Sequence, residues 1–133
     1  MFLKDWFSTS SSSIHRIGFE KLQYYISNSN AHIINTLPSN DQSCLIVKTI
    51  PIKDEESIIN QYMDDHKWTY PLILYGKNAT DTTPEKKAKE LAELGFRDIH
   101  IYCGGLFEWL LLQDIYGKHE FPTIGNGDIL HYK

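Results

Sequence analysis

Short apolar runs alternate with segments of helical periodicity along most of the chain, and this alternation restricts the fold more than any single motif does. The apolar runs lie at 14–17, 31–35, 44–52, 70–76 and 97–102. Helical crossovers between short strands require those strands to run parallel. We therefore expect a single-domain α/β fold, with a small parallel five-stranded sheet flanked by helices on both faces. In such a sheet a ligand site lies at the carboxyl ends of the strands.

The length of 133 residues allows one buried core but not two. The expected domain covers residues 14–117, and residues 118–133 are expected to form an irregular tail. Residues 1–13 combine apolar residues with a serine-rich linker. The apolar residues of this N-terminal arm share roughly one side of a short helix and are Phe2, Leu3, Trp6 and Phe7. The arm either is a docking segment, or folds back on its own domain, or has no fixed structure.

Charge and cysteine usage exclude several classes of function. The formal net charge is −4, and no basic run is longer than Lys86-Lys87, so nucleic acid is not an expected partner. No stretch has the ~20 apolar residues of a membrane span, and the N-terminus does not have the pattern of a signal peptide, so we expect a cytoplasmic protein.

Cys44 and Cys103 show no metal-ligand spacing, and the pair His100 and Cys103 would point to opposite faces of a strand. No metal and no cofactor is expected.

Two helices carry more specific signals. Before the helix that ends at Gly95, Thr82 and Glu85 have the spacing of a capping box, and Gly95 suits a left-handed helix stop. In the segment 106–116, apolar residues spread around nearly the whole helix circumference. This predicts that the helix contributes to a contact surface as well as to the core, with Phe107 and Trp109 as candidate surface residues.

The run LILYGKNATDTTPEKKAKELAELGFRDIHIYCGGLFEW contains Gly95-Phe96, Gly104-Gly105 and Trp109. In this order of segments, roughly residues 14–117 resemble a rhodanese-like domain, the fold of the sulfurtransferases. The family's earlier motif, a strand ending in Asp-x-Arg, is only echoed here, because Asn35 and Leu37 replace the polar pair. The resemblance implies the fold named above and an active-site loop that begins with the catalytic cysteine.

At the position implied for that cysteine the chain has Gly76. The loop contains no sulfur, and its residues are Gly76, Lys77, Asn78, Ala79, Thr80 and Asp81. A sulfurtransferase needs a thiolate that accepts sulfur as a persulfide, so this loop cannot begin the reaction. The resemblance therefore implies a catalytically inactive module that acts in protein binding, scaffolding or regulation, with a protein partner or a second copy of the chain as its ligand.

Alternatives remain at the level of sequence. Backbone and side-chain donors in the loop are suited to an anion or an acidic side chain, and the residues concerned are Gly76, Lys77, Asn78, Thr80 and Thr82. Alternatively, Gly76 lets the loop collapse and close the pocket. Cys103, beside Gly104-Gly105, is the fallback nucleophile of a sulfurtransferase or a related phosphatase-type enzyme. A further alternative is a structural component anchored by its N-terminal arm to a larger assembly or a membrane surface.

Overall fold

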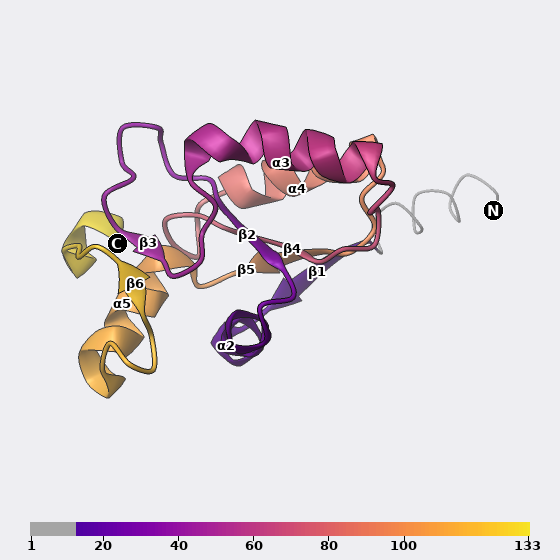
Figure 1. Ribbon diagram of the computed structural model, residues 1–133. Coiled ribbons are helices and arrows are strands. Elements are labelled where there is room, and N and C mark those ends of the chain that lie inside the picture. The colour runs from indigo at the N-terminus through magenta and orange to yellow at the C-terminus, as the bar shows by residue number, and fades with distance from the viewer. Residues whose placement is uncertain (1–12) are drawn as a thin grey trace, which may run out of the picture.

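The computed structural model describes residues 13–133 (Figure 1). The apolar residues of the N-terminal arm, Phe2, Leu3, Trp6 and Phe7, lie outside the described residues. The elements are, in chain order, β1 (Ile14–Ile17), α2 (Phe19–Asn28), β2 (His32–Asn35), β3 (Leu45–Ile46), α3 (Ile52–Asp64), β4 (Leu72–Tyr75), α4 (Thr83–Leu94), β5 (Ile99–Tyr102), α5 (Gly105–Tyr116), β6 (Thr123–Ile124) and the 3₁₀ helix η1 (Ile129–Tyr132).

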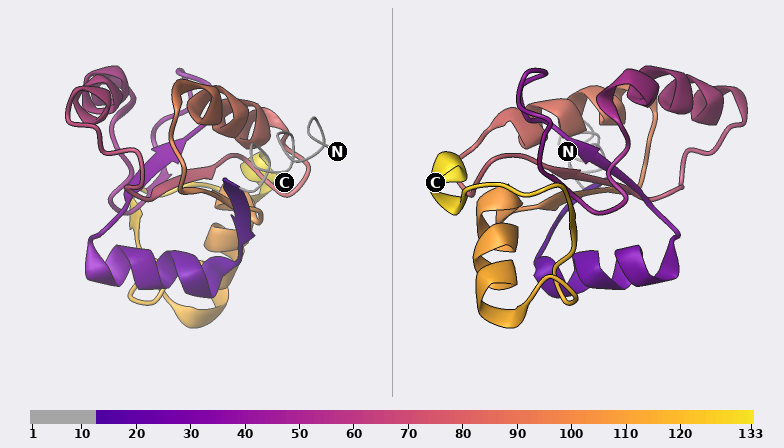
Figure 2. Two further views of the ribbon diagram at one scale, coloured as in Figure 1. Left: turned by 90° about the vertical axis from the view of Figure 1, so that its right-hand side faces the viewer. Right: turned by 60° about the vertical axis from the view of Figure 1, so that its left-hand side comes forward.

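The main sheet is parallel, with the strand order β1-β5-β4-β2. Helices α3 and α4 cover one face, and α2 and α5 lie on the other (Figure 2). The two central strands, β4 and β5, are buried at every position, which explains their nearly continuous apolar sequences. The predicted α/β fold with helices on both faces is confirmed.

Within residues 13–133, the main sheet has four strands instead of the expected five. Of the apolar run 44–52, only Leu45–Ile46 forms a strand, β3, and it pairs antiparallel with β6 in a separate two-stranded sheet. The run touches the main sheet through one parallel bridge between Ile33 and Thr49. The chain turns in between, where Lys48 adopts a left-handed conformation with φ of 68°. That turn prevents the run from continuing alongside β2.

The segment after Gly117, expected to be irregular, contains β6 and η1 and contributes to the core. Phe121 and Tyr132 are buried, and the rings of Trp109 and Phe121 pack edge to face with centroids 5.0 Å apart. The indole nitrogen of Trp109 donates to the carbonyl of Pro122 at 3.0 Å. Because Trp109 is fully buried, its assignment to an exposed contact surface is wrong. The segment after Gly117 therefore covers the side of α5 that carries Trp109.

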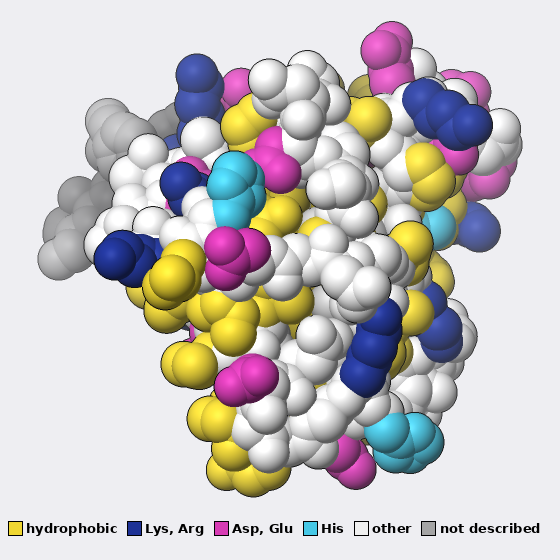
Figure 3. All heavy atoms as spheres, turned by 90° about the vertical axis from the view of Figure 1, so that its left-hand side faces the viewer, with side chains coloured by type: hydrophobic (Ala, Val, Ile, Leu, Met, Phe, Trp, Pro, Cys, Tyr) yellow, Lys and Arg dark blue, Asp and Glu magenta, His cyan; other side chains and the backbone are white. Residues whose placement is uncertain are grey.

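Helix α5 nevertheless keeps an exposed apolar face. Leu111, Ile115 and Tyr116 are exposed, and Phe107 is half-buried. Figure 3 shows hydrophobic side chains gathered on the side of the molecule formed by α5 and the C-terminal segment. Within residues 13–133, no helix has the length and apolar character needed to cross a bilayer.

Candidate functional site

The loop between β4 and α4 lies at the carboxyl edge of the sheet, where the sequence predicts a site. Its first residues are held by the start of α5, because Gly76 O accepts from the N–H of Leu106 and Lys77 O from that of Phe107, each at 2.9 Å. Gly105 makes this close contact feasible. It has φ of 68°, and a Cβ there would lie 2.9 Å from Gly76 O, so a side chain does not fit.

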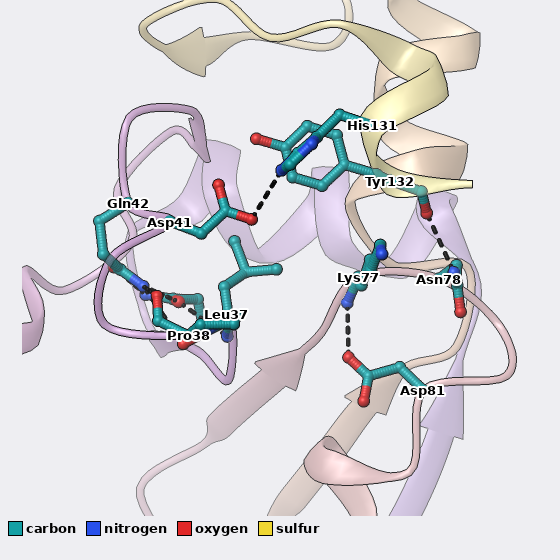
Figure 4. Close-up of polar contacts among 10 residues, drawn as sticks. Leu37, Pro38, Asp41, Gln42, Lys77, Asn78, Asp81, His131 and Tyr132 are labelled. Carbon is teal, nitrogen blue, oxygen red and sulfur yellow. Dashed lines mark hydrogen bonds and ion pairs between the residues drawn. The ribbon is translucent and has the colours of Figure 1, made fainter.

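Asp81 organises the loop from inside. Its carboxylate accepts the N–H of Lys77 at 2.8 Å (Figure 4), the N–H of Thr83 at 2.9 Å and the hydroxyl of Thr83 at 2.7 Å. Burial opposes ionisation of this carboxyl group. The donated hydrogen bonds and the charge of Lys77 outweigh that cost and hold the pKa of Asp81 below its ordinary value. An internal carboxylate therefore occupies the position that the sequence suggested for an external anion.

The same carboxylate fills the space beside Gly76. A Cβ added at Gly76 would lie 2.3 Å from Asp81 Oδ2 and 2.8 Å from Pro84 Cγ, both shorter than real Cβ contacts. Gly76 itself is buried. The catalytic cysteine implied by the family resemblance therefore has no room at this position unless Asp81 moves.

Two other predicted loop residues, Asn78 and Thr80, also have hydrogen-bond partners within the chain. The side-chain amide of Asn78 donates to the carbonyl of Tyr132 at 3.0 Å, and its oxygen accepts the N–H and the hydroxyl of Thr80 at 3.1 and 3.0 Å. Thr82 has helical dihedral angles and makes no side-chain capping bond, so the predicted capping box is wrong. Asp81 accepts the N–H of Thr83 instead. The structure thus places the predicted residues in one loop, and it uses donors of Lys77, Asn78 and Thr80 within the chain.

A C-terminal strap, residues 129–132, closes this edge of the sheet. Besides the bond from Asn78 to Tyr132, His131 Nε2 lies 3.0 Å from Asp41 Oδ2 in the loop after β2 (Figure 4). Burial and the neighbouring Asp41 carboxylate raise the pKa of Tyr132 to about 12. This strap was not predicted from the sequence, where the signal was the apolar character of Ile129, Leu130 and Tyr132 near the end of the tail.

Cys103 lies at the end of β5, next to a small cavity of about 130 Å³ whose wall includes Arg16, Asp81 and Glu85. Its thiol is half-buried, with Sγ 3.7 Å from the carbonyl of Ile101. The neighbouring Cys103 and Glu85 side chains raise the pKa of Arg16 above its ordinary value. The Arg16 guanidinium also forms an ion pair of 2.9 Å with Glu85. No sequence signal pointed to Arg16, because only the β1–β5 pairing places it near Cys103.

The remaining predicted features lie away from this edge or in the core. Cys44 is fully buried, and burial raises the pKa of its thiol. His100 packs against Tyr25 of α2, whereas Cys103 packs on the α4 side, as the strand geometry predicts. Within residues 13–133, no three His, Cys, Asp or Glu side chains are grouped so that they could hold a metal ion.

No protein-family model and no curated protein matches the sequence. Solved structures do match. The BH2092 protein of Bacillus halodurans has a TM-score of 0.63 at 16% identity, covering 96% of this chain and 90% of that one. Ygr203w of Saccharomyces cerevisiae, described as a homolog of single-domain rhodanese and the Cdc25 phosphatase catalytic domain, has a TM-score of 0.62 at 15% identity, with 86% and 90% coverage. The Alr3790 protein of Anabaena, which contains a rhodanese-like domain, has a TM-score of 0.58 at 20% identity, with 82% and 91% coverage.

The fold is rhodanese-like. At these identities the likeness concerns the backbone framework, and the side chains of the site have to be interpreted in this chain alone. In this rhodanese-like framework, the loop after the central strand β4 is present, but its first position is Gly76 and its interior holds Asp81.

Proposed function

We propose that this chain is a catalytically inactive rhodanese-like module that acts in the cytoplasm by binding a protein partner. The observation that supports this proposal is the position of the Asp81 carboxylate, which takes the N–H of Lys77 and fills the space beside Gly76. Persulfide chemistry at this loop requires a thiolate and free inward donors. The loop has no thiol, and its Lys77 and Thr83 N–H groups are already bonded.

The exposed face of α5 is the surface we propose for that partner. Leu111 is 41% exposed, Ile115 61% and Tyr116 64%, and Leu130 of η1 is 68% exposed. Apolar side chains gathered on one side of a small domain are typical of protein interaction sites. Phe107, half-buried and one turn before Leu111 on α5, is the contact residue that we propose beside this face.

Sulfurtransferase activity is the direct test. The chain is incubated with thiosulfate and cyanide, thiocyanate is measured, and the mass of the intact protein is recorded after thiosulfate alone. The proposal predicts no thiocyanate above the protein-free rate and no added sulfur. Turnover that survives Cys103→Ser would refute the interpretation that Asp81 closes the β4–α4 loop to catalysis. Turnover that disappears in this variant would support a second candidate function.

That second candidate is a sulfurtransferase that uses Cys103, and the cavity shared with Arg16 favours it. The Cys103 thiolate would attack the outer sulfur of thiosulfate, forming a persulfide and releasing sulfite, and cyanide would then accept the sulfur as thiocyanate. Arg16 would attract the dianion. The carboxylates of Asp81 and Glu85 in the same wall oppose it, and Glu85 already pairs with Arg16. We therefore rank this candidate second.

Partner binding is tested on the α5 face with Ile115→Glu, because this residue is more exposed than most apolar side chains of the domain. The matched control is Leu94→Glu, at a residue 48% exposed on α4 of the opposite layer. Capture from a native extract should lose a partner with Ile115→Glu and keep it with Leu94→Glu. A second copy of the chain as the partner would appear as a dimer in light scattering, and equal capture by both variants would rule out the α5 face.

A further inference from the structure

A groove runs along α2, between this helix and the segment that follows α5. Figure 2 shows that segment passing between α5 and α2. Two adjoining hollows of about 610 and 490 Å³ form the groove, and Gln23 and Glu120 line both of them. The side chain of Gln23 donates to the carbonyl of Glu120 at 2.9 Å, which links the two walls. The lining extends from Phe19 to Asn28, so the groove follows the whole length of α2, about 15 Å.

The smaller hollow is lined mainly by aromatic and aliphatic side chains. Phe121 is buried there, and its ring centre lies 5.5 Å from that of Phe19 and 6.1 Å from that of Tyr116. Tyr116 is exposed, and Leu112 completes the apolar wall. This hollow suits one apolar side chain of a ligand, because the contact would remove both the ligand side chain and Tyr116 from water.

The larger hollow is acidic. Glu20 and Glu120 are exposed on it, and among residues 13–133 no lysine or arginine lines it. Tyr24, 54% exposed, lies one turn after Glu20, so its ring and that carboxylate share one face of α2. His119 also lines the hollow and is cationic only when protonated. Carboxylates pair with a guanidinium and aromatic rings stack on it, so this hollow suits an arginine side chain.

The neighbouring lysines do not pair with these carboxylates. Lys118 Nζ donates to the side-chain oxygen of Asn126 at 3.0 Å. Lys21 Nζ lies over the rings of Tyr24 and Tyr25, 6.0 and 5.9 Å from their centres. Within residues 13–133, the two glutamates of the groove form no ion pair. The groove therefore combines an apolar hollow with an acidic one, and its charge is complementary to a basic ligand.

We propose that this α2 groove binds an extended segment of a partner protein in which an arginine lies close to an apolar side chain. The apolar side chain enters the hollow beside Phe121, and the guanidinium lies beside Glu20 and Glu120. About five extended residues, at about 3.3 Å each, span the length of α2, so a peptide fills both hollows whereas a small cation fills only one. The inference deepens the proposed function and rests on it for the expectation that the chain binds a protein.

Selection from a random peptide library tests the groove. Peptides displayed on phage are selected on the immobilised full-length chain, and the affinity of enriched peptides is measured by fluorescence anisotropy. Enriched peptides should carry an arginine close to an apolar residue more often than the unselected library does. The dissociation constant should rise about fivefold or more in Glu20→Gln/Glu120→Gln and in Tyr116→Ser. Added salt should weaken binding to the unaltered chain more than binding to the double variant.

The charge-matched control is Glu93→Gln/Asp114→Asn, because both carboxylates are exposed and line neither hollow. It should leave the affinity unchanged, and an unchanged urea midpoint should show that each variant keeps its fold. Ile115→Glu separates the groove from the proposed α5 face. Peptides that lose affinity in Ile115→Glu but keep it in Glu20→Gln/Glu120→Gln would overturn the groove and leave the proposed function standing.

Three further outcomes overturn the groove. The first is enrichment of peptides without a basic residue. The second is no enrichment over an unrelated protein, in which case partner capture on the α5 face decides the proposed function separately. The third is a dimer in light scattering that dissociates in Glu20→Gln/Glu120→Gln, because the groove would then belong to a second copy of the chain.

Discussion

The ends of β4 and β5 are neighbours at one edge of the sheet, yet the residues after them differ in character. After β4, Gly76 carries no side chain and Asp81 fills the space beside it. After β5, Cys103 keeps a thiol next to a small cavity with Arg16 and Glu85. The framework is the same parallel sheet in both places. The same framework therefore accommodates a thiol after β5 but not after β4, because Asp81 fills the space beside Gly76.

The largest effect on this comparison is expected from Gly76→Cys. The new Cβ would overlap Asp81 and Pro84, so the variant should lose about 3 kcal/mol of unfolding free energy, at the upper end of overpacked sites. It should also produce no thiocyanate. Ala79→Cys, at an exposed position of the same loop, should change stability by less than about 0.5 kcal/mol. Urea denaturation measures both, and a Gly76→Cys variant as stable as the unaltered chain would refute the closed loop.

Removing the charge of Asp81 should have the next largest effect. Asp81→Asn loses a charged acceptor for the N–H groups of Lys77 and Thr83, and should cost about 1.5 kcal/mol. The folded-state pKa of Asp81 is lowered, so the stability it contributes is present above its unfolded pKa of about 3.9 and is lost as pH falls through the folded value. The difference between the two proteins should therefore shrink in acid.

The control for this measurement is Asp114→Asn, at an exposed residue of α5. It should show no such difference at any pH. A constant difference between Asp81→Asn and the unaltered chain from neutral pH to strong acid would mean that the loop does not depend on the ionised carboxylate.

On β5, His100 gives a pH response in a different range. Burial lowers the pKa of His100, as do His15 and Lys21 to a lesser extent, while Asp98, 2.7 Å away, opposes them. A lowered pKa means that the unfolded chain binds the proton first, so stability should be complete above about pH 6.5 and fall as pH decreases below it. His100→Gln should flatten this part of the profile. His32, whose pKa is also lowered, is present in both proteins, so its contribution cancels when the two pH profiles are compared. An unchanged slope would contradict the prediction.

The smallest effect concerns thiol reactivity. Iodoacetamide should modify Cys103 in the native chain and Cys44 only on unfolding, because Cys44 is fully buried. Arg16→Gln should slow the Cys103 reaction by less than about fivefold. One charge near a partly exposed thiol contributes about 1 kcal/mol or less, and the Arg16 charge is already paired with Glu85. Arg97→Gln, at an exposed arginine, is the control and should leave the rate unchanged. Equal protection of both cysteines would remove the contrast between the strand ends.

The order of strands and helices could be predicted from the sequence because periodicity is local. Apolar runs such as 70–76 and the stop at Gly95, where φ is 121°, depend on residues a few positions apart. The same local pattern placed the candidate loop at the carboxyl edge of the sheet. It also predicted that β5 points His100 and Cys103 to opposite faces.

Contacts between distant segments could not be predicted in this way. The run 44–52 has a strand-like sequence, but the turn at Lys48 and the pairing with β6 remove it from the main sheet. The sequence pattern predicted Trp109 as a surface residue, but in the folded chain Pro122 and Phe121 cover it. The sequence alone determined the rhodanese-like framework and the absence of a cysteine at position 76. Only the tertiary structure showed that Asp81 closes the loop, because its role depends on backbone donors and on the space beside Gly76 that folding brings together.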